Sequence, residues 1–412
     1  MVLGLLVLMA IPYAPAFAQV GTADAAVQQA VAYIRTQQAP DGTFAGFGAG
    51  STADAIYALV AAGANPAEFK NGGASAVEGL IKAAPEAAKD TGVAAKFVLA
   101  SLLAGQDPRA LGGIDLVAAV QNGYDAAAER YGNDTTSEAL AVLALQAAGD
   151  PVRLASIAKL EQQQLPDGGW SFDATPATGS DTNTTALVLQ ALISASGTPE
   201  VRARALEYLR AQQNADGGFP YSQTSQFGNA SDANSTALSI QAILAAGESM
   251  SDWIKDGKSP VDRLLAFQNP SGAFRYQDSA PDDNQLATYQ AVPAIAGKTF
   301  PMEPVPITQP EVQPVAPTVI APSATTAGAP TPTFLPTPQS TLAGAQTATT
   351  MPGPQPTTAA GSTSTTSPVA TPSAGVPTQF PAAGTPALPV LGLLAVAIAV
   401  LALGIGLRQR NA

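Results

Sequence analysis

The chain has 412 residues, of which 46% are hydrophobic, and a formal net charge of −12. This length allows one or two large buried cores, and the acidic balance, with no cluster of Lys and Arg, argues against nucleic acid as a partner. Histidine and cysteine are both absent, which excludes thiol catalysis, Cys/His zinc sites and disulfides.

The first 18 residues are predicted to be a secretory signal peptide. An apolar run from Val2 to Ile11 precedes the small-residue triplet 16–18, so we expect cleavage before Gln19. The region that follows, 19–300, would then be the folded domain outside the membrane.

One eight-residue phrase occurs four times in this domain. Its copies are QQAPDGTF (37–44), QQLPDGGW (163–170), QQNADGGF (212–219) and FQNPSGAF (267–274). Each follows a stretch with apolar residues at helical spacing. Glycine ends the helix, and the aromatic residue packs the turn back onto it. The phrases are therefore predicted to be corners, with Phe44, Trp170, Phe219 and Phe274 packed in them.

A second pattern precedes runs rich in Ala and Leu. Its six starts are Gly48, Asp90, Asp134, Asp181, Asp232 and Asp282, which lie 42, 44, 47, 51 and 50 residues apart. An Asp before such a run caps the N-terminus of a helix. With the amphipathic stretch before each start, the pattern predicts six helical hairpins.

Six hairpins form either an open solenoid or a closed ring. Small residues on the second helix of each pair favour the ring, because six inner helices that converge on one axis need thin side chains. The expected fold is all-α, an (α/α)6 toroid. Its inner helices would all begin at one polar mouth.

The remainder of the chain changes character. Residues 301–386 are rich in Pro and Thr and are predicted to be a disordered stalk. Residues 387–407 are apolar and long enough for one transmembrane helix, and 408–412, with Arg408 and Arg410, would be a cytoplasmic tail. The expected location is the extracellular face of the cell membrane, with the chain crossing once.

The corner phrase resembles the QxxDGGW repeat of squalene cyclases. The doubled ring of helices is similar to the α/α toroid that these enzymes share with prenyltransferase β-subunits, complement thioester domains and cobalamin carriers. The resemblance covers about residues 24–297. Zinc-dependent prenyltransferases need Cys and His, and thioester domains need Cys, so neither chemistry fits this chain.

Squalene–hopene cyclases protonate their substrate with a D-x-D-D-T-A segment. The matching stretches here are DTNTTA (181–186) and DANSTA (232–237), in which Asn183 and Thr184, and Asn234 and Ser235, replace the second and third acids. An amide or a hydroxyl cannot supply that proton. A cyclase would need a displaced acid, for which Asp54, Glu138 and Asp283 are the candidates.

The same stretches are similar to the inner-helix phrase of cobalamin carriers. The resemblance implies cobalamin as a ligand and these binding residues: Asp181, Asn183, Thr184, Gln190, Asp232, Asn234, Ser235, Gln241, Asp282 and Asn284. Gln190 and Gln241 either point into the ring or bond to a neighbouring helix. Carriers close over the ligand with a second domain, which a partner protein would have to supply here. No metal site is expected.

Two hypotheses for function follow. The first is a non-catalytic toroid, anchored at the cell surface, that binds a small molecule or a partner. The alternative is an enzyme like the terpenoid cyclases, with its acid in another position.

Overall fold

The computed structural model describes residues 17–46, 48–226 and 228–302. Nearly all of the predicted signal peptide lies outside these residues, and so do the predicted transmembrane helix, the tail and the stalk beyond Met302. Among the described helices, none is both long and apolar enough to cross a membrane.

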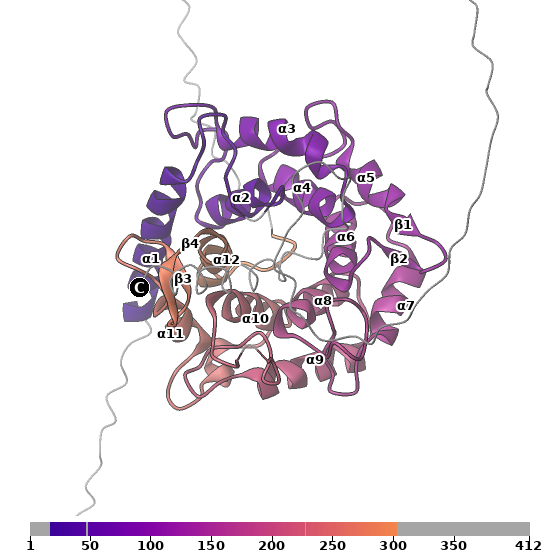
Figure 1. Ribbon diagram of the computed structural model, residues 1–412, viewed down its shortest axis with the longest axis vertical. Coiled ribbons are helices and arrows are strands. Elements are labelled where there is room, and N and C mark those ends of the chain that lie inside the picture. Colours follow the sequence, from indigo (N-terminus) through magenta and orange to yellow (C-terminus); the bar gives the residue numbers. More distant parts are fainter. Residues whose placement is uncertain (1–16, 47, 227, 303–412) are drawn as a thin grey trace, which may run out of the picture. The chain divides into compact units, whose positions relative to one another are not determined.

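The described residues form twelve α-helices that alternate between an outer and an inner layer (Figure 1). The outer helices are α1 (Phe17–Thr36), α3 (Ala76–Ala87), α5 (Leu116–Asn122), α7 (Leu154–Gln162), α9 (Pro199–Gln212) and α11 (Pro260–Leu265). The inner helices are α2 (Ser51–Ala61), α4 (Thr91–Leu103), α6 (Thr135–Ala147), α8 (Thr182–Ser194), α10 (Ala233–Ala245) and α12 (Gln285–Ile295).

The ring is closed. Each inner helix packs against the next, and α12 packs against α2 and α1, so the last unit meets the first. Closure encloses inner helices on all sides: every residue of α2 is buried, and so is every residue of α8 from Thr182 to Leu192. The small Ala side chains allow helices to pack this closely. The predicted all-α toroid of helical hairpins is confirmed for the described residues.

Where it occurs, the corner phrase joins its unit to the next one. In the third copy, Gln213 donates from Nε2 to the carbonyl of Gly217 within the corner (3.0 Å) and to the carbonyl of Trp253 in the next unit (2.6 Å). Phe219 is fully buried, and its backbone N–H donates to the hydroxyl of Thr236 on the inner helix (3.0 Å). The corner is thus bonded to its own turn, its inner helix and its neighbour.

The other three copies repeat these contacts. Each glutamine donates from Nε2 to the carbonyl of its own corner glycine and to one carbonyl in a neighbouring unit. The second bonds are Gln38 to Phe69, Gln164 to Val201 and Gln268 to Ala26. The backbone N–H groups of Phe44, Trp170 and Phe274 donate to Thr52, Thr185 and Thr288. All the corner aromatics are buried, which confirms their predicted packing role. The bond from Gln268 to Ala26 is one of those that join the last unit to the first, as is the bond from Gln285 to Gln37.

Four of the predicted Asp caps are confirmed. Asp90, Asp134, Asp181 and Asp232 each accept a hydrogen bond from the third residue of an inner helix. The prediction was wrong for the two remaining starts: α2 begins after Gly50 rather than Gly48, and Asn284, not Asp282, caps α12. Asp282 lies instead in a strand, and its side chain is exposed.

Short antiparallel hairpins account for this shift and replace the corner phrase in one of the two units that lack it. Strands β3 (Phe274–Gln277) and β4 (Ala280–Asn284) pair just before α12, so the strand continues through Asp282. Strands β1 (Tyr124–Asp125) and β2 (Arg130–Tyr131) join α5 to α6, where the sequence has no DGG phrase.

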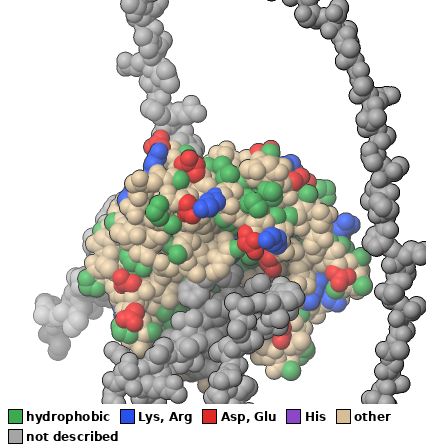
Figure 2. All heavy atoms as spheres, turned by 45° about the horizontal axis from the view of Figure 1, so that its top comes forward, with side chains coloured by type: hydrophobic (Ala, Val, Ile, Leu, Met, Phe, Trp, Pro, Cys, Tyr) green, Lys and Arg blue, Asp and Glu red, His purple; other side chains and the backbone are tan. Residues whose placement is uncertain are grey.

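The outer surface carries both signs of charge. On the face in Figure 2, acidic and basic side chains lie beside one another. Several form exposed ion pairs such as Lys82 with Asp41 and Lys89 with Glu86. Exposed pairs of this kind contribute little to stability. The candidate site is therefore described from the side chains in the interior of the ring.

Candidate functional site

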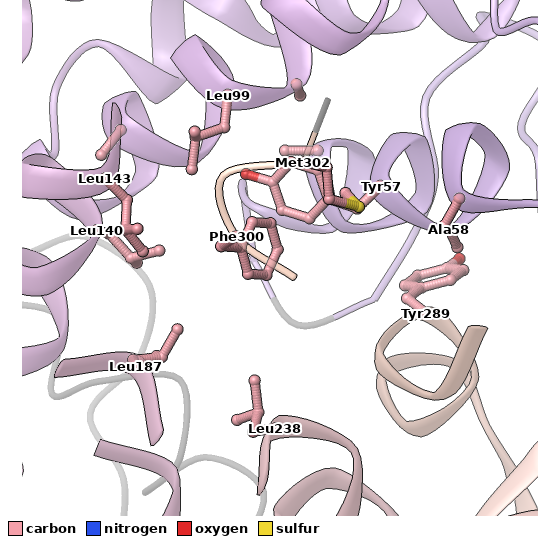
Figure 3. Packing of buried hydrophobic residues seen from close by; sticks show 14 of the residues in the cluster. Tyr57, Ala58, Leu99, Leu140, Leu143, Leu187, Leu238, Tyr289, Phe300 and Met302 are labelled. Carbon is pink, nitrogen blue, oxygen red and sulfur yellow. The ribbon is translucent and has the colours of Figure 1, made fainter. Parts of the chain in front are cut away.

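Leucines of the inner helices form an apolar wall at the centre of the ring. They are Leu99, Leu140, Leu143, Leu187 and Leu238, each at most 9% exposed and all in one hydrophobic cluster. Figure 3 shows them around Phe300, which belongs to the segment after α12. We call this region, with the polar residues described below, the central site.

The chain itself enters the central site after α12. Gly297 has a φ of +67°, and Lys298 N–H donates to Pro293 O (2.9 Å), which reverses the chain. In earlier units the chain leaves such a glycine for the next outer helix, whereas no outer helix follows α12 in the described chain. Phe300 and Met302 instead lie inside, each 9% exposed.

Two inner helices hold this segment. The backbone N–H of Phe300 donates to Gln190 Oε1 on α8 (2.9 Å). Its ring meets Tyr57 of α2 edge to face, with centroids 5.0 Å apart and planes at 74°, an arrangement that aromatic pairs prefer. The segment therefore combines a backbone hydrogen bond with apolar packing.

Two predicted glutamines occupy equivalent places on neighbouring helices. Gln190 and Gln241 each lie nine residues after an Asp cap and three after an inward leucine, Leu187 or Leu238. Residues three apart on a helix share a face. Because Gln190 bonds to the central segment, the first of its two predicted alternatives, pointing into the ring, is confirmed.

Unpaired amide oxygens add polarity to the central site. Gln241 Oε1 and Asn183 Oδ1 have no hydrogen-bond partner within the described residues, although their side chains are only 1% and 5% exposed. Asn234, the counterpart of Asn183 on α10, donates to Gln290 of α12 (2.7 Å). A buried acceptor without a donor costs about 1–3 kcal/mol, so the two free oxygens are suited to a ligand that brings an N–H or O–H.

A buried ion pair joins α2 to α4 beside Tyr57. Lys96 Nζ on α4 lies 2.7 and 2.8 Å from the two carboxylate oxygens of Asp54 on α2, and both side chains are buried. Tyr57 donates its hydroxyl to the Lys96 carbonyl (2.6 Å). Both carboxylate oxygens of Asp54 are therefore engaged by the Lys96 ammonium, and the ion pair ties α2 to α4.

The predicted site residues at the helix starts have a structural role. Asp181 and Asp232 are buried and accept hydrogen bonds from the backbone N–H groups of Thr184 (2.8 Å) and Ser235 (2.7 Å). Burial raises the pKa of Asp181 to about 6 and that of Asp232 to about 7, against the lowering effect of these bonds. Asn284 is likewise a cap, through Ala287 N–H (2.9 Å).

The other candidate acids also lie outside the central site. Glu138 is fully buried, and burial raises its pKa to about 7, but its Oε1 accepts from Ser156 of the outer helix α7 (2.9 Å). Asp283 is exposed and bonded to Asn269 and Ser271. Among the described residues, no group of acidic side chains is arranged to hold a metal ion.

The structure thus separates the ten predicted binding residues into distinct groups. The residues that lie three or four positions from Leu187 or Leu238, and so share the inward helix face, are Asn183, Gln190, Asn234 and Gln241. The residues of the caps are Asp181, Thr184, Asp232, Ser235 and Asn284. Asp282 lies on an exposed strand.

Sequence reasoning missed the segment that fills the central site. Phe300 and Met302 stand at the junction with the Pro-rich region, where composition suggests a linker. The one available signal was local: TFPM (299–302) holds an aromatic residue and a methionine directly before the low-complexity sequence. Tyr57 was missed as well, although it is an aromatic residue on an Ala-rich inner helix.

Comparison with known proteins gives structural likeness only. No protein-family model matches the chain, and no curated protein does. A structure of the type II terpene cyclase MstE from Scytonema, in complex with geranylgeranyl dihydroxybenzoate, matches with a TM-score of 0.49 and 12% identity, over 68% of this chain and 98% of that one. Haptocorrin in complex with Cbi matches with a TM-score of 0.43 and 15% identity, over 67% of each chain.

A protein from Actinoplanes is also similar, with a TM-score of 0.44 and 15% identity over 67% of this chain and 98% of that one. Solved structures similar to this chain thus include both kinds of protein that the sequence resembles, a cyclase-like toroid and a cobalamin carrier. Such identities and TM-scores carry no information about activity. The description of the ring rests on its own helices and contacts.

Proposed function

We propose that this chain is a non-catalytic toroid, anchored at the cell surface, that binds a ligand in its central site. The observation that carries the proposal is the pair of buried, unpaired acceptors, Gln241 Oε1 and Asn183 Oδ1, beside an apolar wall. Ligand sites in proteins combine such walls with a few placed polar groups. The ligand would be a small molecule or a partner that packs against the wall and offers N–H or O–H groups.

The arrangement of the acids supports binding over cyclisation. A cyclase needs a neutral carboxyl group that faces its substrate. Here Asp54 is paired with Lys96, and Glu138 bonds to an outer helix. Anchoring at the membrane is proposed from the sequence alone, because the segments that would provide it lie outside the described residues.

Cobalamin is the specific small molecule to test first, because the inner-helix phrases resemble those of its carriers. The full-length protein, purified in detergent, is titrated with cobalamin and followed by visible absorbance. Native mass spectrometry of the same sample reports any ligand that co-purifies. One-to-one binding of cobalamin, or a co-purified molecule, is the expected result; an empty protein that binds no cobalamin contradicts the proposal as it concerns small molecules.

A single substitution tests the central site directly. Gln241→Leu removes an unpaired buried acceptor, so we expect Tm to stay the same or rise. It also removes a hydrogen bond to the ligand, and we expect binding to weaken about tenfold, the effect of a bond worth roughly 1.4 kcal/mol. Gln146→Leu, at a half-buried position near the end of α6, is the matched control. A fall in Tm with unchanged binding would mean that Gln241 is only structural.

A further inference from the structure

We propose that the central site is a peptide-binding site, that Phe300–Met302 is its resident ligand, and that an external extended peptide with an aromatic side chain competes with this segment. The proposal rests on the proposed function, since it names the class of ligand for the same site. It follows from the way in which the site holds the chain's own segment.

The contacts to the resident segment are those that any similar peptide could make. Gln190 accepts a backbone N–H, which every residue except proline offers. Tyr57 receives the edge or face of an aromatic ring, and the leucine wall surrounds it (Figure 3). Backbone bonding gives general affinity, and the aromatic contact gives preference for one side chain.

The site offers one more acceptor than the resident segment uses. Gln241 occupies on α10 the place that Gln190 occupies on α8, and its Oε1 is without a partner in the described part of the chain. Pro301, which follows Phe300, has no N–H to donate. A peptide with a donating residue in a suitable position could bond to both glutamines, which provides a reason for it to displace the resident.

The tether makes the resident a permanent local competitor. The segment leaves α12 through Gly297 and Lys298, both exposed at the end of the helix, so only a few residues separate it from the ring. A short tether gives a high effective concentration. The apparent affinity for an external peptide therefore equals its intrinsic affinity multiplied by the fraction of molecules in which the site is open.

The test compares the full-length protein with the double variant Phe300→Ala, Met302→Ala. The probe is a fluorescein-labelled peptide of residues 296–302, acetylated and amidated, and binding is followed by fluorescence anisotropy. We expect the variant to bind it about tenfold more tightly or better, because the resident no longer competes. The same peptide with Phe300→Ala should bind weakly to both proteins. Adding Gln190→Leu to the double variant should weaken binding, whereas adding Gln146→Leu should not.

A second measurement needs no substitution. Hydrogen–deuterium exchange of residues 296–302 in the unmodified protein should speed up when the unlabelled peptide is added, since displacement frees the Phe300 amide from Gln190. Equal affinity for both proteins, together with unchanged exchange, would overturn the proposal. If the double variant binds the apolar dye 8-anilinonaphthalene-1-sulfonate at the central site but not the peptide, the ligand-binding function stands and the peptide assignment falls. If it binds neither, both fall.

Discussion

At the scale of single residues, Glu138 shows how the ring adapts where its repeat is incomplete. The equivalent position on α8 and α10 is a threonine, Thr185 or Thr236, whose hydroxyl receives the corner N–H. The third unit has no such corner, and Glu138 accepts from Ser156 of α7 instead. The result is a fully enclosed carboxyl group, whose Oε2 has no partner among the described residues.

This residue predicts a dependence of stability on pH. Burial raises the pKa of Glu138 from 4.5 to about 7 in the folded state, so between these values the folded protein binds a proton that the unfolded chain has released. The resulting stability is fully present below pH 4.5 and is lost as pH rises through about 7. Asp181 and Asp232, whose pKa values are raised in the same direction, add to the trend.

The substitution Glu138→Gln isolates the contribution of this group. The amide stays neutral, so at about pH 8 the variant should be more stable than the natural protein, by up to about 3 kcal/mol, and the gain should vanish near about pH 4. Denaturant unfolding across this range measures the difference. The exposed Glu68→Gln is the control, and a difference that does not change with pH would contradict the assignment.

At the scale of elements, the corner is the unit of assembly. Its glutamine bonds to two carbonyl groups, one in its own turn and one in the following unit, so a single side chain fixes both the shape of the turn and its contact with the neighbour. Gln213→Ala should therefore cost about 2–3 kcal/mol, because it leaves the Gly217 and Trp253 carbonyls without their donor. Thermal unfolding compared with Gln226→Ala, at an exposed position, gives the difference; equal effects would show that the corner bonds contribute little.

At the scale of the whole molecule, the last corner closes the ring onto α1. Gly272 has a φ of +88°, and a Cβ built there would lie 2.3 Å from Gln29 O. Gly272→Ala must therefore push the sixth unit away from the first. Gly247 has a similar φ of +77° but nothing within 4 Å of its Cβ position, so Gly247→Ala measures backbone strain alone.

We expect Gly247→Ala to cost about 1 kcal/mol, and Gly272→Ala a further 1–3 kcal/mol or so from the clash. Urea unfolding monitored by circular dichroism measures both. A molecule that tolerated the two changes equally would have a ring that does not depend on this contact.

Local sequence was sufficient to predict the repeating parts of the ring. Glycine, glutamine and an aromatic residue at fixed spacing specify a corner, and an Asp before an Ala-rich run specifies a cap, because each depends on bonds within a few residues. The error at Asp282 came from a strand pairing, β3 with β4, that the register of the repeat could not show.

The contents of the ring centre, in contrast, were decided only by the tertiary structure. Gln190 and Phe300 are 110 residues apart, and Asp54 and Lys96 are 42 apart on separate helices. The sequence specified which residues face inward on each helix, because that follows from helical periodicity. Which of them meet, and that residues 300–302 come to lie among them, depends on how the closed ring brings helices that are distant in sequence around one apolar centre.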